Sequence, residues 1–425
     1  MARLFYTFRP PDSYSFAAQL LTWSRKFRVF MYFKNHPYPH GWQQAPWMLA
    51  AGVRHEWKPQ PERALAQLAS FHASLHDWMV GHAGYHMAAH IWPGISRKPC
   101  LCGFPEIYFF VPEILVLVYP DQVQIGIHGS EAEARRIFEE ISKSTVNLPQ
   151  LRHPLSIFPV LTRKQYLDTI HAILHHIRRG DCYELNFCQL FASDQVKISP
   201  VETFTQLPPA PFSLCYRLHD SYLLCASPER YLLKRGRQIL MQPMKGTIRR
   251  GSNAQEDAQL QLSLQQSPKE RAENTIVVDL VRNDLSRTAV PGSVKVTEWL
   301  KIYSYPTVHQ MISTICSEMD TAYQIGDLLA TTFPMGSMTG APKKKVLELI
   351  DHYESWPRGI YSGTAGYITP EGDMEMNVII RSLLYAQDDR RVYYHAGSGI
   401  TCYCHPEAEW EECLIKTKQL AHIRI

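Results

Sequence analysis

Several features that mark common classes of protein are missing from this 425-residue chain. It has no Lys/Arg stripe with interleaved aromatic residues, and a net charge of +4 with a pI of about 8.4 is only mildly basic, so nucleic-acid binding is not indicated. The longest apolar run, 108–119, is interrupted by Pro112 and Glu113 and is too short to span a bilayer. The first residues, MARLFYTFRPPDS, lack the charged, apolar and small-residue layout of a secretion signal. We therefore expect a soluble, cytoplasmic protein that binds neither nucleic acid nor membrane.

Signatures of zinc binding are also missing, although the chain has 10 cysteines. No C-x-x-C pair occurs, and the two C-x-C pairs, Cys100/Cys102 and Cys402/Cys404, lack the spacing of a structural zinc site. Because no secretion signal is evident, we expect buried free thiols in a reducing compartment rather than disulfides. No cysteine is assigned a catalytic role.

The order of expected elements indicates an α+β protein with large sheets covered by helices. Helical periodicity is clear at 61–79, at 130–142, where Ser130 and Glu133 form a capping box, and at 163–180. A strand follows at 182–192, and the later order is neither strict βαβ nor all-β. Residues 1–150 form an N-terminal region without a catalytic motif, which we expect to fold together with the rest.

Two pairs of glutamates stand out in the C-terminal half. Glu270 and Glu273, and again Glu409 and Glu412, lie three residues apart on one face of a predicted helix. Each pair has lysines nearby, so a solvated face with local ion pairs is one interpretation. The alternative is that the four carboxylates converge on one hard cation, for which Mg²⁺ with an anionic substrate is suitable.

Features that favour anion binding accompany the acidic pairs. The glycine-rich loop FPMGSMTGAPK runs into a helix, whose free N–H groups attract a carboxylate or phosphate; its three lysines are expected to be solvated. Gly397 and Gly399 permit close approach of backbone to a ligand, and Arg381 offers a fork for a carboxylate. A predicted hairpin of two partly buried strands over 231–244 leads to Lys245. Because the second strand is apolar, the side chain of Lys245 is expected to point into the protein. Together these features describe a site for a small dianion.

The C-terminal part of the sequence resembles a known family. The motifs that carry the resemblance, in order and spacing, are SPERYLL, PMKGTIRRG, ENTIVVDLVRNDLSR, PGSVKV, VHQMIST, FPMGSMTGAPK, GIYSGTAGYITPEGDMEMNVIIRSLL, AGSGI and EAEWEE. They are similar to those of the chorismate-utilising enzymes, over roughly residues 160–422, which we take as the catalytic region. The resemblance implies an anthranilate synthase component I-like fold, with large antiparallel sheets packed face to face and covered by helices.

Lys245 distinguishes the branches of this family. Anthranilate synthases carry alanine in the corresponding P-I-A-G-T motif, whereas PMKGT resembles the aminodeoxychorismate synthase branch. The isochorismate and salicylate enzymes use another lysine, in a K-V-V-L strand, which CYELNFCQL lacks. The resemblance therefore implies that ammonia and chorismate yield 4-amino-4-deoxychorismate, in the para-aminobenzoate branch of folate biosynthesis.

The resemblance also implies roles for single residues. Neutral Lys245, its pKa lowered by desolvation, attacks the ring at C2 and expels the 4-hydroxyl, and ammonia then displaces the lysine by attack at C4. Glu229 is the general acid, unless it forms an ion pair with Arg230, and His309 lies beside the ring, unless it is a hydrogen-bonded core histidine. Glu273 and Glu412 bind Mg²⁺ directly, with Glu270 and Glu409 completing its surroundings. The residues expected to bind substrate are Thr247, Ser337, Thr339, Gly340, Tyr361, Arg381, Gly397 and Gly399.

No glutaminase Cys-His signature is present, so a separate glutamine amidotransferase subunit is expected to deliver the ammonia. Two alternatives stay open. One is an ammonia-dependent anthranilate synthase component I, which releases pyruvate, and the other is a non-catalytic chorismate-binding partner protein. The sequence does not decide whether an effector binds the N-terminal region.

Overall fold

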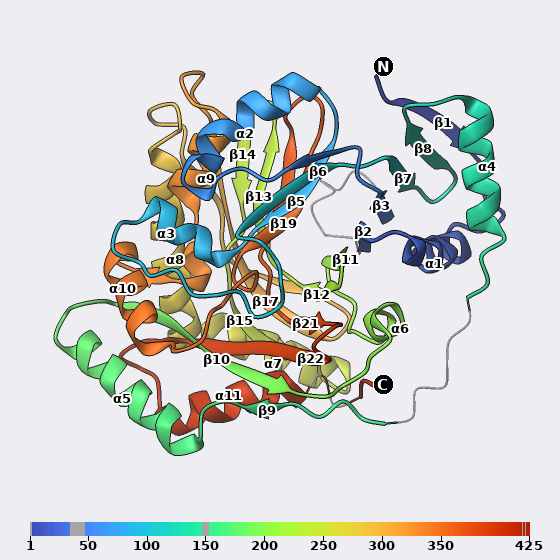
Figure 1. Cartoon of the computed structure of the whole chain (residues 1–425). Coiled ribbons are helices and arrows are strands. Elements are labelled where there is room, and N and C mark those ends of the chain that lie inside the picture. Colours follow the sequence, from blue (N-terminus) through green and yellow to red (C-terminus); the bar gives the residue numbers. More distant parts are fainter. Residues whose placement is uncertain (1, 35–46, 147–152, 419, 421) are drawn as a thin grey trace.

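Two large antiparallel sheets form the framework of the chain (Figure 1). The computed structural model describes residues 2–34, 47–146, 153–418, 420 and 422–425. Every strand pairing within these residues is antiparallel. The expected α+β class is therefore confirmed.

The first sheet has twelve strands in the order β1-β8-β7-β3-β2-β11-β12-β21-β22-β10-β18, with β9 paired to β10 beside this path. Its strands are β1 (Leu4–Phe8), β2 (Val29–Lys34), β3 (Trp47–Ala51), β7 (Ile114–Val118), β8 (Val123–Ile127), β9 (Phe158–Pro159), β10 (Glu184–Ser193), β11 (Phe212–Leu218), β12 (Ser221–Ser227), β18 (Gly340–Ala341), β21 (Ser382–Ala386) and β22 (Arg391–Ile400). Strands β10 and β22 are the longest of this sheet and pair along nearly their whole length.

The second sheet has ten strands in the order β15-β17-β14-β13-β20-β19-β5-β6-β4, with β16 paired to β17. Its strands are β4 (His55–Trp57), β5 (Met79–Ala83), β6 (Ile107–Val111), β13 (Arg230–Arg235), β14 (Gln238–Met241), β15 (Met244–Arg249), β16 (Lys295–Ser304), β17 (Val308–Glu318), β19 (Thr364–Ile368) and β20 (Met374–Asn377). The predicted hairpin is confirmed as the β13–β14 pair.

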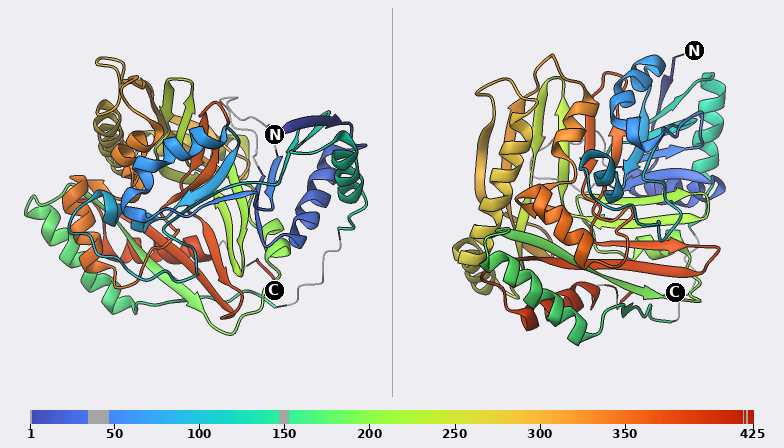
Figure 2. Two further views of the ribbon diagram at one scale, coloured as in Figure 1. Left: turned by 45° about the horizontal axis from the view of Figure 1, so that its top comes forward. Right: turned by 60° about the vertical axis from the view of Figure 1, so that its left-hand side comes forward.

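Helices cover the outer faces of the sheets (Figure 2). The α-helices are α1 (Ser13–Trp23), α2 (Pro61–Leu75), α3 (Ala88–Ile91), α4 (Glu131–Ser142), α5 (Arg163–Arg178), α6 (Pro200–Thr205), α7 (Ala254–Gln266), α8 (Pro268–Ser286), α9 (Ile325–Thr332), α10 (Lys343–Tyr353) and α11 (Pro406–Lys418), and the 3-10 turns are η1 (Ser24–Lys26), η2 (Tyr85–Met87) and η3 (Gly336–Met338). The capping box of Ser130 and Glu133 is confirmed at the start of α4. Helix α11 lies against β22 and beside α5 (Figure 1). No helix in the described part of the chain is long and apolar enough to cross a membrane.

Aromatic side chains of both sheets meet in one hydrophobic core. The rings of Phe33 on β2 and Tyr367 on β19 lie 6.1 Å apart, and those of His82 on β5 and Tyr216 on β11 lie 5.6 Å apart. Burying such large apolar groups is the main stabilising contribution to the fold. The predicted face-to-face packing of the sheets is therefore confirmed.

The N-terminal region contributes to both sheets. Strands β1, β2, β3, β7 and β8 belong to the first sheet, whereas β4, β5 and β6 belong to the second. Residues before 150 and after 160 thus share one hydrogen-bonded framework. The division into regions 1–150 and 160–422 stays a prediction, and its boundary at 147–152 lies outside the described residues.

The start of α10 differs from the sequence-based expectation. Lys343 is not solvated but buried, with an exposed fraction of 6%, and forms an ion pair with buried Asp284 on α8. An unpaired buried charge is strongly destabilising, so this pair fixes the distance between the two helices. It thereby positions α8, which carries the first glutamate pair, against the glycine-rich loop.

Candidate active site

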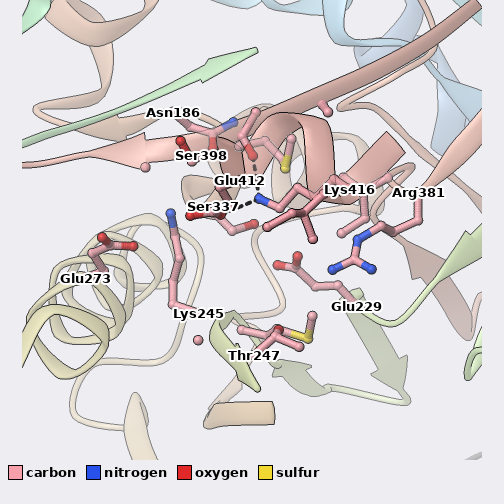
Figure 3. Close-up of a pocket in the computed structure, with 18 of the residues that line it drawn as sticks. Asn186, Glu229, Lys245, Thr247, Glu273, Ser337, Arg381, Ser398, Glu412 and Lys416 are labelled. Atoms are coloured by element: carbon pink, nitrogen blue, oxygen red, sulfur yellow. Dashed lines mark hydrogen bonds and ion pairs between the residues drawn. The ribbon is translucent and has the colours of Figure 1, made fainter. Parts of the chain in front are cut away.

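Most of the predicted site residues surround one cavity of about 480 Å³ (Figure 3). Its walls come from β10 and β22 of the first sheet, from β15 of the second sheet, and from helices α8 and α11. Segments far apart in the sequence therefore meet there. The predicted residues that line the cavity are Glu229, Lys245, Thr247, Glu270, Glu273, Ser337, Tyr361, Arg381, Gly397, Gly399 and Glu412.

Lys245 reaches the cavity from an irregular strand. It does not end the β13–β14 hairpin, as the sequence suggested, but belongs to the separate strand β15. The pairing of β15 with β17 shifts register between Met244 and Thr247, and Gly246 has a positive φ of 88°. Such a bulge redirects the neighbouring side chain, and glycine adopts this backbone conformation without strain. The local sequence K-G-T thus aims the lysine into the cavity.

The amine of Lys245 is held by carboxylates. Its Nζ donates a hydrogen bond of 2.5 Å to Oε1 of Glu184 on β10. Burial would lower the pKa of Lys245, but the negative charges of Glu184 and Glu273 outweigh burial and hold the pKa above its ordinary value. The expectation that desolvation lowers the pKa of Lys245 is therefore wrong, because the neighbouring carboxylates raise this pKa by more than burial lowers it.

Glu229 lies at the entry to β13 and is 4% exposed. Burial raises the pKa of its carboxyl to about 7, against the opposing effects of the Ser337 hydroxyl and the charge of Lys245. Arg230 donates its hydrogen bonds to Glu375, at 2.8 Å, and to Gln242, at 2.6 Å. Glu229 is therefore a buried carboxyl whose pKa lies near neutral pH, so both its protonated and its ionised form are populated there.

The two glutamate pairs come from α8 and α11. Burial raises the pKa of Glu273 to about 8 and also raises that of Glu270. For Glu412, burial is outweighed by the cation of Lys416, which lies 2.7 Å away and lowers the pKa of Glu412. Three of the four glutamates line the cavity, whereas Glu409 does not.

Lys269 bridges the two helices. Its Nζ lies 3.0 Å from Oε1 of Glu409 and 3.9 Å from Oε1 of Glu273. Local lysines thus do pair with the glutamates, which was the alternative interpretation of the sequence. Within the described residues, no three acidic, histidine or cysteine side chains are grouped closely enough to hold a metal ion. The predicted convergence of four carboxylates is therefore not present in this arrangement.

Besides Glu409, three more predicted residues are not part of the cavity wall. His309 on β17 is 1% exposed, and its two ring nitrogens lie 2.8 Å from Ser304 Oγ and 3.0 Å from Asp257 Oδ1. This is the hydrogen-bonded core histidine that the sequence left open. Its contacts hold β17, β16 and α7 together behind the lysine strand.

Thr339 and Gly340 support the cavity from behind. The hydroxyl of Thr339 donates a 3.1 Å hydrogen bond to the backbone oxygen of Met335, and its own carbonyl accepts one of 2.7 Å from the N–H of Asn186. Gly340 has a φ of 142°, and a Cβ there would lie 2.0 Å from the carbonyl oxygen of Glu184. Both residues thus fasten the glycine-rich loop to β10 rather than face the cavity.

Sequence reasoning missed polar residues on strands of the first sheet. Glu184 and Asn186 alternate with apolar residues on β10, and Asn186 lines the cavity, as does Ser398 on β22. A carboxylate and an amide two residues apart in an apolar strand point to the same face of the sheet. That alternation was the signal available in the sequence.

The sequence of the chain is similar to those of chorismate-utilising enzymes. The sequence profile of chorismate binding enzymes matches residues 29–422. Aminodeoxychorismate synthase component 1 of Salmonella typhimurium is 37% identical over 264 residues, which are 62% of this chain and 58% of that protein. Anthranilate synthase component 1 of Aquifex aeolicus is 30% identical over 366 residues, which are 80% of this chain and 73% of that protein.

The fold is also similar to that of a solved structure. Anthranilate synthase component I from Streptococcus pneumoniae superimposes with a TM-score of 0.74 over 99% of this chain and 92% of that chain, at 22% sequence identity. The expected component I-like fold is therefore confirmed. The match to the Salmonella protein spans less than two thirds of that protein's length.

Proposed function

The chain belongs to the family of chorismate binding enzymes, and on that premise we propose that it converts chorismate and ammonia to 4-amino-4-deoxychorismate. The observation that carries this proposal is the amine of Lys245 in the same cavity as the protonatable carboxyl of Glu229. The Salmonella relative named for this activity supports it. The pathway role is the supply of para-aminobenzoate for folate synthesis, in the cytoplasm.

The first chemical step joins Lys245 to the substrate. The neutral amine attacks C2, the ring double bonds shift, and the C4–O bond breaks. Glu229 gives its proton to the departing hydroxide, which leaves as water, so the products are a secondary ammonium on Lys245 and an ionised Glu229. Ammonia then attacks C4 and releases the lysine. A protonated Glu229 is necessary because hydroxide is a poor leaving group.

The remaining cavity residues are suited to binding a dianion. Figure 3 shows the guanidinium of Arg381 and the carboxyl of Glu229 directed into the same part of the cavity. We assign Arg381 and Tyr361 to the enolpyruvyl carboxylate, because guanidinium forks bind carboxylates with two hydrogen bonds. Gly397, Gly399, Thr247 and Ser337 line the same cavity. We assign the glycine backbone and the two hydroxyls to further contacts with the substrate.

We propose that a magnesium ion binds the acidic residues of α8 and α11 and draws them closer together than they lie in the structure. Oε1 of Glu273 and Oε2 of Glu409 are buried and have no hydrogen-bond partner among the described residues, and such atoms are costly unless a cation or proton satisfies them. Glu273 and Glu412 would hold Mg²⁺, and Glu270 and Glu409 would complete its surroundings. When bound, Mg²⁺ withdraws charge from the ring carboxylate and fixes the ring. His309 is not included in the proposed site, because it lies outside the cavity wall and both of its ring nitrogens are hydrogen-bonded.

Glu273→Gln is expected to lose Mg²⁺ binding by at least about tenfold while the fold is retained. The amide keeps the shape of the side chain but cannot ionise, whereas the Glu273 carboxyl, with a pKa of about 8, can lose its proton when Mg²⁺ binds. Calorimetric titration of Mg²⁺ in the absence of chorismate measures this directly, and Glu407→Gln on the exposed side of α11 is the matched control. Unchanged Mg²⁺ affinity in Glu273→Gln would remove Glu273 from the site.

A separate subunit is proposed to supply the ammonia. The Salmonella and Aquifex relatives are named as component 1, which supports the existence of a second component. That this component releases ammonia from glutamine is part of the proposal. A second candidate function is anthranilate synthesis, favoured by the longer match to the Aquifex protein. The lysine at position 245 argues against it, because the anthranilate branch resembles this chain but carries alanine there.

Product analysis tests the proposed function. The purified chain, supplied with chorismate, Mg²⁺ and ammonium, is expected to form 4-amino-4-deoxychorismate without pyruvate, and glutamine is not expected to replace ammonium. Pyruvate and anthranilate in equal amounts would instead show the second candidate. No product from either route, with a folded and chorismate-binding chain, would indicate the non-catalytic alternative.

A further inference from the structure

Glu184 is the hydrogen-bond partner of the proposed nucleophile, Lys245. Its Oε1 accepts the 2.5 Å hydrogen bond from Lys245 Nζ. The two side chains are 1% and 11% exposed, so solvent does not compete strongly for either group. Because Glu184 lies on β10 and Lys245 on β15, the contact joins the first sheet to the second.

The backbone around this contact leaves space for it. Gly399 lies opposite Asn186 in the β10–β22 pairing. A Cβ at Gly399 would lie 2.8 Å from Oε1 of Glu184 and 2.8 Å from Nζ of Lys245, which is closer than real side chains allow. A side chain at this position would therefore push the tips of Glu184 and Lys245 out of their present positions.

The second oxygen of Glu184 is also informative. Oε2 is buried and has no hydrogen-bond partner among the described residues. A buried oxygen without a partner is destabilising, so the fold gains little from having a carboxylate here rather than an apolar side chain. The hydrogen bond to the Lys245 amine therefore explains the Glu184 carboxylate better than a contribution to the stability of the sheet does.

We propose that Glu184 is a positioning residue that holds the amine of Lys245 in the orientation from which it attacks the substrate. This inference rests on the proposed function of Lys245. A lysine stem has four rotatable bonds, and a fixed acceptor at its tip removes most of the alternative positions of the amine. The acceptor oxygen, and not the presence of a charge, is what this role requires.

The test compares variants that keep or remove the acceptor. With chorismate and Mg²⁺ but no ammonia, the rate of covalent attachment to Lys245 is followed by mass spectrometry. Glu184→Gln retains a side-chain oxygen but removes a charge that raises the pKa of Lys245, so its rate is expected to be no lower than about a third of the wild-type rate. Glu184→Leu is expected to be at least about thirtyfold slower, with the KM for chorismate little changed, since Glu184 does not bind substrate.

Two further variants keep the test decisive. Glu202→Leu removes a buried carboxylate that pairs with Arg25 outside the cavity, and it should attach chorismate at the wild-type rate. Glu184→Ala replaces the leucine variant if that chain does not fold. A wild-type rate in Glu184→Leu or Glu184→Ala would overturn the inference, and so would an equally large loss in Glu184→Gln. Absence of attachment in the wild type would instead reject the role of Lys245 itself.

Discussion

Lys245→Ala is expected to lower ammonia-dependent turnover by roughly 10³-fold, which corresponds to about 4 kcal/mol of lost transition-state stabilisation. The loss is large because the nucleophile itself is removed. A small residual rate is expected, since ammonia can enter at C2 where the lysine would attack. That residual chemistry resembles the alanine-bearing anthranilate branch, so traces of anthranilate and pyruvate should accompany it. Stopped assays with separation of the products measure both effects.

Lys245→Arg separates nucleophilic from electrostatic roles. Arginine keeps the positive charge near Glu184 but stays protonated, so it cannot act as an amine nucleophile. It should therefore be as inactive as the alanine variant. Lys234→Ala is the control, because Lys234 is a largely buried lysine on β13 that donates to the backbone of Gly372 and does not line the cavity. An active Lys245→Arg enzyme would show that only the charge matters.

Replacing Glu229 by glutamine is expected to slow turnover by about 10²–10⁴-fold and to change the pH profile of kcat/KM. The productive form needs a protonated Glu229 and a neutral Lys245. Below the Glu229 pKa of about 7, Glu229 stays protonated while the neutral fraction of Lys245 rises with pH, so the rate rises. Above pH 7 the further gain in neutral amine is offset by loss of the protonated acid, so the wild-type profile should level off.

In Glu229→Gln the acid no longer titrates. Its slower rate should keep rising above pH 7, because only the lysine then limits the productive fraction. Glu375→Gln is the matched control, since Glu375 is another buried glutamate of the second sheet, bound to Arg230 rather than directed into the cavity. A profile that levels off near pH 7 in both the wild type and Glu229→Gln would assign that titration to a different group.

The helices and the hairpin could be predicted because their signals are local. The capping box at Ser130 fixes the start of α4, and the short Arg-Gly turn fixes the β13–β14 hairpin. The pairing order of the sheets could not be predicted in this way, since β2 pairs with β11 across nearly two hundred residues of sequence. The resemblance to a family supplied the face-to-face antiparallel sheets but not this pairing order.

Site residues that belong to sequence motifs could be predicted. Residues whose role depends on contacts between distant parts of the chain could not. Glu184 lies in an ordinary apolar strand, and its role depends on Lys245 arriving from the other sheet. Likewise, Lys343 looked like part of a solvated basic run until Asp284 of α8 was placed beside it. His309 belongs to a matching motif, yet its hydrogen bonds to Ser304 and Asp257 are decided by the packing of β16 and α7.

The covalent intermediate on Lys245 tests the central claim most directly. The wild-type chain is incubated with chorismate and Mg²⁺ without ammonia at mildly alkaline pH, digested, and its peptides weighed and sequenced by mass spectrometry. The account predicts that the peptide containing Lys245 gains the mass of chorismate less one water, because water displaces the lysine poorly, and that added ammonium releases it as 4-amino-4-deoxychorismate. Turnover with ammonium at a normal rate, but with an unmodified Lys245 peptide under all conditions, would contradict the account.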